Sequence, residues 1–176
     1  MVIKSSILIF LKMINITHYQ SPIGDILLAS RENKLIGSWI KGQKFYLQNI
    51  DEEIIEKEDE ILSKAKKWLD KYFKGEKPPI NELDLAPNGT EFRLSVWEIL
   101  LEIPYGKTIT YKEIADRIAL KRGISKMSAQ AVGGAVGHNP IAIIIPCHRV
   151  VGSDGSLTGY AAGLDKKIFL LNHEND

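Results

Sequence analysis

The spacing of apolar residues divides the chain into a first half with the alternation typical of β-strands and a second half with helical periodicity. Three runs rich in β-branched and aromatic residues predict strands at residues 14–19, 26–30 and 35–40. A charged connection at 51–60 precedes residues 61–73, whose apolar positions predict an amphipathic helix. Because this half offers no paired catalytic groups, we interpret residues 13–77 as an α/β scaffold domain.

A proline-rich segment, residues 78–89, separates the two halves and is interpreted as an interdomain linker. Residues 90–176 are then expected to form a mostly helical domain. Its first helix is expected to begin after Thr90, a good capping residue, and to run to about Leu101.

The middle of this second domain has the pattern of a helix-turn-helix. Thr110 and Glu113 have the spacing of a capping box at the start of one short helix. A second helix is expected at about 127–137, capped by Ser125 or Ser128 and ended by the sequence Asn139-Pro140. The glycine-bearing turn between them supports this motif, and a last helix is expected at 165–172.

The second of these helices contains three glycines, at positions 133, 134 and 137. Each costs about 0.8–1 kcal/mol of helix propensity relative to alanine, so stability alone does not explain them. They favour close approach of the helix backbone to a bulky partner such as DNA, with close packing on a neighbouring helix as the alternative. The segment from Lys107 to Arg149 carries seven basic and two acidic residues, which suits a surface that contacts phosphates.

Cys147, the only cysteine, follows an apolar run that predicts a short buried strand or extended segment within residues 139–150. A lone cysteine is usually a small buried hydrophobe. Here His148 and Arg149 follow it directly, and both can favour the nucleophilic thiolate. The segment is therefore a candidate site for nucleophilic chemistry.

Composition sets the remaining limits. The chain has 176 residues, 44% hydrophobic and 26% charged, which is typical of one or two ordinary globular domains. A single cysteine excludes an internal disulfide and a thiolate zinc cluster, and it favours a reducing, cytoplasmic location. Residues 1–12 hold an apolar run too short for a signal peptide or a membrane span, and we expect them to be an extra, poorly ordered extension.

Several motifs together resemble those of the O6-alkylguanine-DNA alkyltransferases, also called methylated-DNA–protein-cysteine methyltransferases. They are Pro146-Cys147-His148-Arg149-Val150, the glycine-rich residues 131–137, Asn139-Pro140, and residues 155–160. The resemblance runs from about Gly89 to Glu174. It implies an α/β (α+β) fold, with a small ribonuclease H-like sheet domain followed by a helical domain with a winged-helix-like helix-turn-helix.

The resemblance also implies a reaction and its partners. The alkyl group of O6-methylguanine, and of O4-methylthymine as a further substrate, would pass irreversibly to Cys147 in a single turnover, with no cofactor and no metal. The partner would be double-stranded DNA contacted in its minor groove, with the damaged base flipped out of the helix, and the protein would be a monomer.

Roles for individual residues follow from the resemblance in the same way. Besides the Cys147 nucleophile, the catalytic group comprises His148 as a base acting through a water, Glu174 orienting it after the last helix, Tyr111, and Asn139 as a polar brace. The substrate-binding residues are Val136, Val150, Tyr160, Ala161 and Gly163. The DNA-binding residues are Thr110, Gln130, Ala131, Gly133, Gly134 and Arg149. Gln130 stands where the family usually has an arginine, which predicts weaker DNA affinity.

Three other functions fit parts of the sequence. A module that binds alkylated DNA without transfer would share the fold but does not need the cysteine. A helix-turn-helix regulator with Cys147 as redox sensor would require a dimerisation segment. A cysteine hydrolase would require an oxyanion-hole motif, and none is evident.

Overall fold

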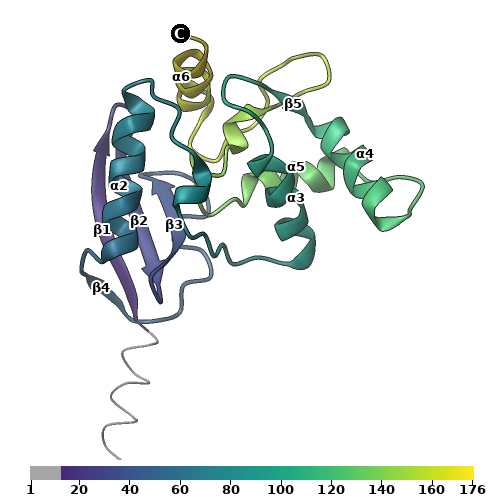
Figure 1. Ribbon diagram of the computed structural model, residues 1–176. Coiled ribbons are helices and arrows are strands. Elements are labelled where there is room, and N and C mark those ends of the chain that lie inside the picture. Colours follow the sequence, from purple (N-terminus) through teal and green to yellow (C-terminus); the bar gives the residue numbers. More distant parts are fainter. Residues whose placement is uncertain (1–12) are drawn as a thin grey trace, which may run out of the picture.

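The first half of the chain folds into a sheet covered by one helix, and the second half into a group of helices beside it (Figure 1). This computed structural model describes residues 13–176, so the expected extension at 1–12 lies outside the described residues. The α/β (α+β) fold class expected from the sequence is confirmed.

The sheet of the described chain has four strands in the order β3-β2-β1-β4. Their bounds are Ile14–Ser21 for β1, Gly24–Arg31 for β2, Lys34–Ile40 for β3 and Ile54–Glu56 for β4. The first three are antiparallel neighbours and confirm the three predicted strands. The charged connection at 51–60 was expected to lack regular structure, and this is wrong for its residues 54–56, which form β4. This three-residue strand pairs in parallel with β1, so it depends on a distant partner rather than on a pattern of its own.

Helix α2, Glu60–Phe73, lies against the sheet and confirms the predicted amphipathic helix. Asp59 caps it by accepting a hydrogen bond from the Leu62 amide at 3.0 Å. Its last turn buries the ring of Tyr72, whereas Phe73, which the pattern placed on the apolar face, is only partly buried. The orientation of α2 about its axis therefore points the Tyr72 hydroxyl toward the second domain.

The proline-rich crossing at 78–89 packs along the sheet instead of standing free. It contains a short 3₁₀ helix, η1, at Ile80–Glu82. Beyond it the chain pairs with Leu35, which donates to the Asp84 carbonyl at 2.8 Å and accepts from the Ala86 amide at 2.8 Å. Leu83 is buried, so this segment contributes to the core.

The second half contains the predicted helix-turn-helix. Its elements are α3 Glu91–Leu101, β5 Ile109–Thr110, α4 Tyr111–Arg122, α5 Ala129–Gly137, η2 Cys147–Arg149, β6 Val150–Val151 and α6 Leu164–Asn175. Thr90 caps α3, Thr110 and Glu113 form the capping box of α4, and Ser128 rather than Ser125 caps α5. Gly123 ends α4 in the left-handed conformation that glycine adopts without penalty.

The segment before Cys147 is not the strand that its apolar run predicts. Residues 141–145 form a tight turn, closed by a hydrogen bond of 3.0 Å from the Ile145 amide to the Ile141 carbonyl. The Asn139 side chain accepts from the Ile141 amide at 3.0 Å and donates to the Ile145 carbonyl at 2.8 Å. Because a short apolar run is compatible with any buried conformation, these side-chain bonds decide the backbone.

One hydrophobic core joins the two halves. It runs without a break from the α2-facing side of the sheet through α3, α4 and α5 to residues 141–147 and Leu170 of α6. Within residues 13–176 no helix has the length and apolar character needed to cross a bilayer. The last helix buries Lys167, Leu170 and Glu174, whereas Ile168, expected to dock it, is 44% exposed.

Candidate active site

Cys147 lies in the wall of a cavity of about 260 Å³ between the two halves of the chain. Most of its lining comes from three segments: α5 and the turn after it, residues 159–162, and residues 43–45 of the loop after β3. The residues predicted from the sequence that line it are Tyr111, Gly133, Gly134, Val136, Asn139, Cys147, Tyr160 and Ala161. Residues 43–45 were missed, because nothing in their sequence indicates contact with the second domain.

The Cys147 side chain sits at the start of η2 and is only 6% exposed. Burial raises the pKa of the thiol, because desolvation disfavours the charged form. The Asn139 amide and the Lys167 ammonium oppose that shift without cancelling it. Burial therefore favours the thiol over the thiolate in the resting protein, and the side chains of His148 and Arg149 are bonded to Glu174.

His148 is fully buried and bonded to a carboxylate. Its Nε2 lies 2.6 Å from Oε1 of Glu174, and its Nδ1 has no hydrogen-bond partner among the residues described. Burial lowers the pKa of this imidazole, although Glu174 opposes the shift, so the neutral form is favoured. Placing the proton on Nε2, as the network requires, leaves the Nδ1 lone pair free to accept one.

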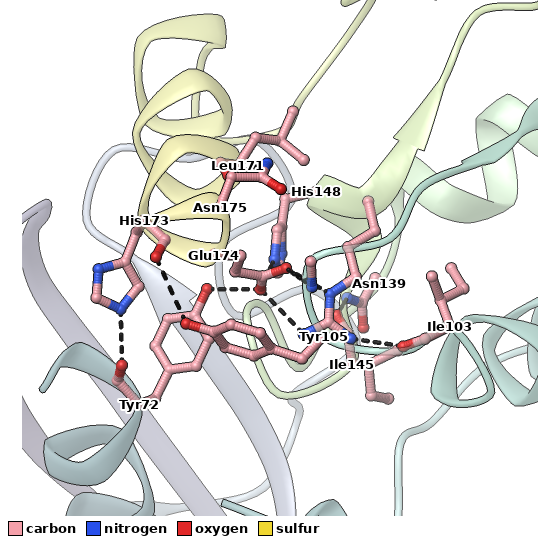
Figure 2. Close-up of polar contacts among 12 residues, drawn as sticks. Tyr72, Ile103, Tyr105, Asn139, Ile145, His148, Leu171, His173, Glu174 and Asn175 are labelled. Atoms are coloured by element: carbon pink, nitrogen blue, oxygen red, sulfur yellow. Dashed lines mark hydrogen bonds and ion pairs between the residues drawn. The ribbon is translucent and has the colours of Figure 1, made fainter. Parts of the chain in front are cut away.

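Glu174 belongs to the last turn of α6 and not to the segment after it, as the sequence suggested. Figure 2 shows its carboxylate between His148 and Tyr72. Its Oε1 accepts from the Tyr72 hydroxyl at 2.8 Å, and its Oε2 accepts from the Gly106 amide at 3.2 Å. Burial alone would raise the pKa of this carboxyl, but bonds from His148 and Arg149 hold it well below its ordinary value.

Arg149 points into the protein, which contradicts its assignment as a DNA-binding residue. Its Nε and Nη2 donate to the two oxygens of Glu174 at 2.8 and 2.9 Å, and its Nη1 donates to the Ile103 carbonyl at 2.6 Å. Only 6% of its side chain is exposed. Its charge therefore balances the buried carboxylate and is directed neither at a phosphate nor at the thiol.

Lys167 is a buried residue that the sequence reasoning missed. Its ammonium donates to the carbonyls of Thr158 at 3.4 Å and Gly159 at 3.1 Å, and it lies 6.0 Å from the Tyr111 ring centroid. Its spacing of three from Leu170 and seven from Glu174 is a signal that could have placed it on the buried face of α6. Through these bonds Lys167 holds in place the segment that lines the cavity.

Tyr111 and Tyr160 flank the sulfur. The Tyr111 hydroxyl donates to the Thr158 carbonyl at 2.9 Å, and burial raises the pKa of this phenol, so it remains a donor. Burial and the nearby Cys147 raise the pKa of Tyr160 well above its ordinary value. The Tyr160 hydroxyl is buried beside the Cys147 side chain.

Three predicted site residues shape the backbone without lining the cavity. Thr110 caps α4, and Val150 is a fully buried residue that begins β6. Gly163 has a φ of 101°, and its amide closes a turn onto the Tyr160 carbonyl at 2.9 Å. A side chain there would collide with Asp165, so the glycine serves the turn rather than ligand contact.

The outer face of α5 is open. Gln130, Ala131 and Gly134 are exposed there. A Cβ built on Gly134 or Gly137 meets nothing within 4 Å, and one on Gly133 meets only the Tyr111 ring at 3.8 Å. Packing inside the protein therefore does not account for these glycines, and their contact with an external partner stays a prediction.

Comparisons with known proteins agree with this site. The family model described as 6-O-methylguanine DNA methyltransferase, ribonuclease-like domain, matches residues 14–87, and that of the DNA binding domain matches residues 91–176. A methylated-DNA–protein-cysteine methyltransferase of Methanosarcina barkeri is 50% identical over 158 residues, which cover 89% of this chain and 94% of that protein. The chain belongs to this methyltransferase family. The resemblance found in the sequence is thereby confirmed.

More distant members agree. A relative of the same name from Haemophilus influenzae is 39% identical over 160 residues, covering 90% of this chain and 84% of that protein. The crystal structure of Mycobacterium tuberculosis OGT in complex with DNA superposes with a TM-score of 0.77 at 39% identity, covering 92% of each chain. As a family member, the chain is a DNA-repair protein that transfers alkyl groups from methylated DNA to a protein cysteine.

Proposed function

We propose that Cys147 is itself the acceptor, and that it takes the alkyl group of O6-methylguanine once and permanently. The observation that carries this proposal is the position of the sulfur. Cys147 lies in the same cavity as the glycines of the open helix α5, directly before a buried histidine with one free ring nitrogen. We include O4-methylthymine as a second substrate, since it also carries an alkyl group on an exocyclic oxygen.

The proton of the thiol must leave before sulfur can attack. We propose that it passes to Nδ1 of His148 through a bridging water, and that the negative Glu174 stabilises the imidazolium that results, as in a catalytic triad. The thiolate then attacks the alkyl carbon in line, the bond from carbon to O6 breaks, and the guanine recovers a proton. The product is a thioether with no route back to a thiolate, so each molecule acts once.

Tyr111 is the donor proposed for the leaving base. Its hydroxyl is bonded to the Thr158 carbonyl in the resting protein and must turn toward the base to act. The ammonium of Lys167 already lies 3.4 Å from the same carbonyl and can satisfy it when Tyr111 turns away. This exchange would keep the Thr158 carbonyl hydrogen-bonded.

The damaged base has to leave the duplex to reach a sulfur that is 6% exposed. We propose that α5 enters the minor groove, with Gln130, Ala131, Gly133 and Gly134 against the DNA. The Cys147 carbonyl and the Ala161 amide, which belong to residues lining the cavity, would then read the flipped guanine between Val136 and Tyr160. The crystal structure of Mycobacterium tuberculosis OGT was obtained in complex with DNA, which supports DNA as the partner of this chain.

The glutamine at position 130 leads to a specific prediction about DNA affinity within this arrangement. It is exposed at the start of α5, where an arginine would add a charge beside the phosphates. Gln130→Arg should tighten binding to double-stranded DNA, and the slope of log affinity against log salt should steepen by about 0.9 for one added phosphate contact. Equal affinity of variant and parent at the same salt would contradict it.

The decisive experiment is the intact mass of the protein after incubation with a duplex carrying O6-methylguanine. We expect the mass to rise by one methyl group on Cys147, with one equivalent of DNA repaired per protein, and no change for Cys147→Ser. A duplex with O4-methylthymine tests the second substrate. An unchanged mass together with a shifted gel band would instead indicate a module that binds alkylated DNA without transfer.

Other properties are proposed on the same basis. A reactive free thiol persists best in a reducing compartment, so we propose a cytoplasmic location. We also propose that the protein is a monomer and that it needs neither cofactor nor metal. Residues 13–77 would serve as the first domain, 78–89 as the connection and 90–176 as the domain that holds DNA. Within residues 13–176, no group of three or more metal-ligating side chains comes together.

A further inference from the structure

The loop that follows β3 reaches from the sheet to the cavity in the second domain. Gln43 anchors it, since its side-chain oxygen accepts from the Ile40 amide at 2.7 Å and the residue is buried. The next amide, that of Lys44, donates to the Ala161 carbonyl at 2.9 Å. Residues 43–45 therefore form a wall of the cavity that also contains Cys147.

Phe45 has an unusual backbone conformation in this loop. Its φ of 59° is a left-handed conformation that a bulky residue rarely adopts. Its ring stacks on His138 with centroids 3.8 Å apart and planes 24° apart, and the residue remains 40% exposed. Strained backbone persists only where its surroundings hold it, and it is common where a binding site needs a side chain in one position.

His138 provides a fixed partner for this ring. It caps the C-terminal end of α5, and its Nδ1 donates to the Gly134 carbonyl at 2.7 Å. The exposed residues Gln130 and Ala131 lie at the other end of the same nine-residue helix, about 11–12 Å away by the helical rise. The aromatic pair thus lies at the end of the cavity that is farther from Gln130 and Ala131.

We propose that Phe45 is a specificity-determining residue that limits the size of the alkyl group Cys147 can accept. The inference rests on the proposed entry of the base from the α5 side. The carbon that is transferred must lie between O6 and the sulfur, so any further atoms on it must project into the remaining space. A methyl group needs none of that space, whereas a benzyl group needs the volume that the Phe45 ring borders.

The test compares two duplexes, one with O6-methylguanine and one with O6-benzylguanine, by the rate at which each adds its alkyl group to the protein. Phe45→Ala should raise the ratio of benzyl to methyl rates by about tenfold or more, since even one methylene group in a hydrophobic pocket changes discrimination by about 10- to 200-fold. Phe45→Trp should lower the ratio. The ratio is the readout, because a change that merely disturbed the site would lower both rates together.

Tyr46→Ala is the matched control. Tyr46 is also an exposed aromatic of this loop, but its ring lies beside Trp39, at 6.2 Å between centroids, and it does not line the cavity. The control should leave the ratio unchanged. Thermal unfolding of all three variants shows whether the loop change has altered the fold.

The outcomes separate this inference from the proposed function. If the parent gains a methyl group but the ratio is the same in both Phe45 variants, or if both rates fall together, Phe45 does not determine specificity. If the parent gains neither group, the proposed acceptor role of Cys147 is wrong, and the assignment of Phe45 is overturned with it.

Discussion

Arg149 provides the sharpest test of how this site is held together. The sequence assigned it to DNA, whereas its guanidinium is bonded to both oxygens of Glu174 and to the Ile103 carbonyl. The two charged side chains are 6% and 1% exposed, so water screens them little. Arg149→Met keeps the length of the side chain and removes its charge and its three hydrogen bonds.

The expected loss of stability follows from the carboxylate that remains. Removing one partner of a buried ion pair typically costs about 3–5 kcal/mol, because the other charge stays desolvated without compensation. For a chain of this size each kcal/mol lowers Tm by about 2–4 °C, so Tm should fall by about 6–20 °C. Urea unfolding gives the free energy directly, and Glu174→Gln in the same variant should recover part of it.

Arg117→Met is the control for the loss of an arginine as such. Arg117 pairs with Glu102 at 3.4 Å, and both side chains are more than half exposed. Such a surface pair contributes about 0–1 kcal/mol, so the midpoint of unfolding should barely move. The reasoning fails if Arg149→Met unfolds like the parent but binds DNA more weakly, with a salt slope lower by about 0.9.

Three further predictions concern the same network. Lys167→Met should slow the alkylation of Cys147 by iodoacetamide at neutral pH by up to about tenfold and move the pH profile of that alkylation to higher pH. The reason is that the Lys167 ammonium opposes the raised pKa of the Cys147 thiol. An unchanged pH profile would contradict this. Tyr72→Phe should cost about 1.5–3 kcal/mol in urea unfolding, since it removes a hydrogen bond to the buried carboxylate of Glu174, and a change below the error of the measurement would refute it. Stability should fall as the pH drops below 6.5 and faster below 4.5. The folded protein lowers the pKa values of His148 and Glu174, so the unfolded chain protonates these two side chains at a higher pH than the folded protein does. In urea unfolding, Glu174→Gln should show a shallower loss of stability below pH 4.5.

Local features of the fold were predictable because their causes lie within a few residues. The Thr110 capping box, the Ser128 cap and the strands of the first hairpin depend on side chains that bond to their own backbone or alternate along it. The pentapeptide around Cys147 was specific enough to indicate the family. Strand β4 was not predictable, because its three residues pair with β1 some forty positions earlier.

The sequence by itself determined most of the helices and strands, the place of Cys147 as the candidate nucleophile and the family to which the chain belongs. Only the tertiary structure decided what surrounds that nucleophile. Tyr72 contacts Glu174 across 102 positions, Arg149 turns inward to the same carboxylate, and Phe45 crosses from the sheet to the cavity. The physical reason is that burial and charge pairing depend on which surfaces meet when the two halves pack, and no periodicity within one segment contains that information.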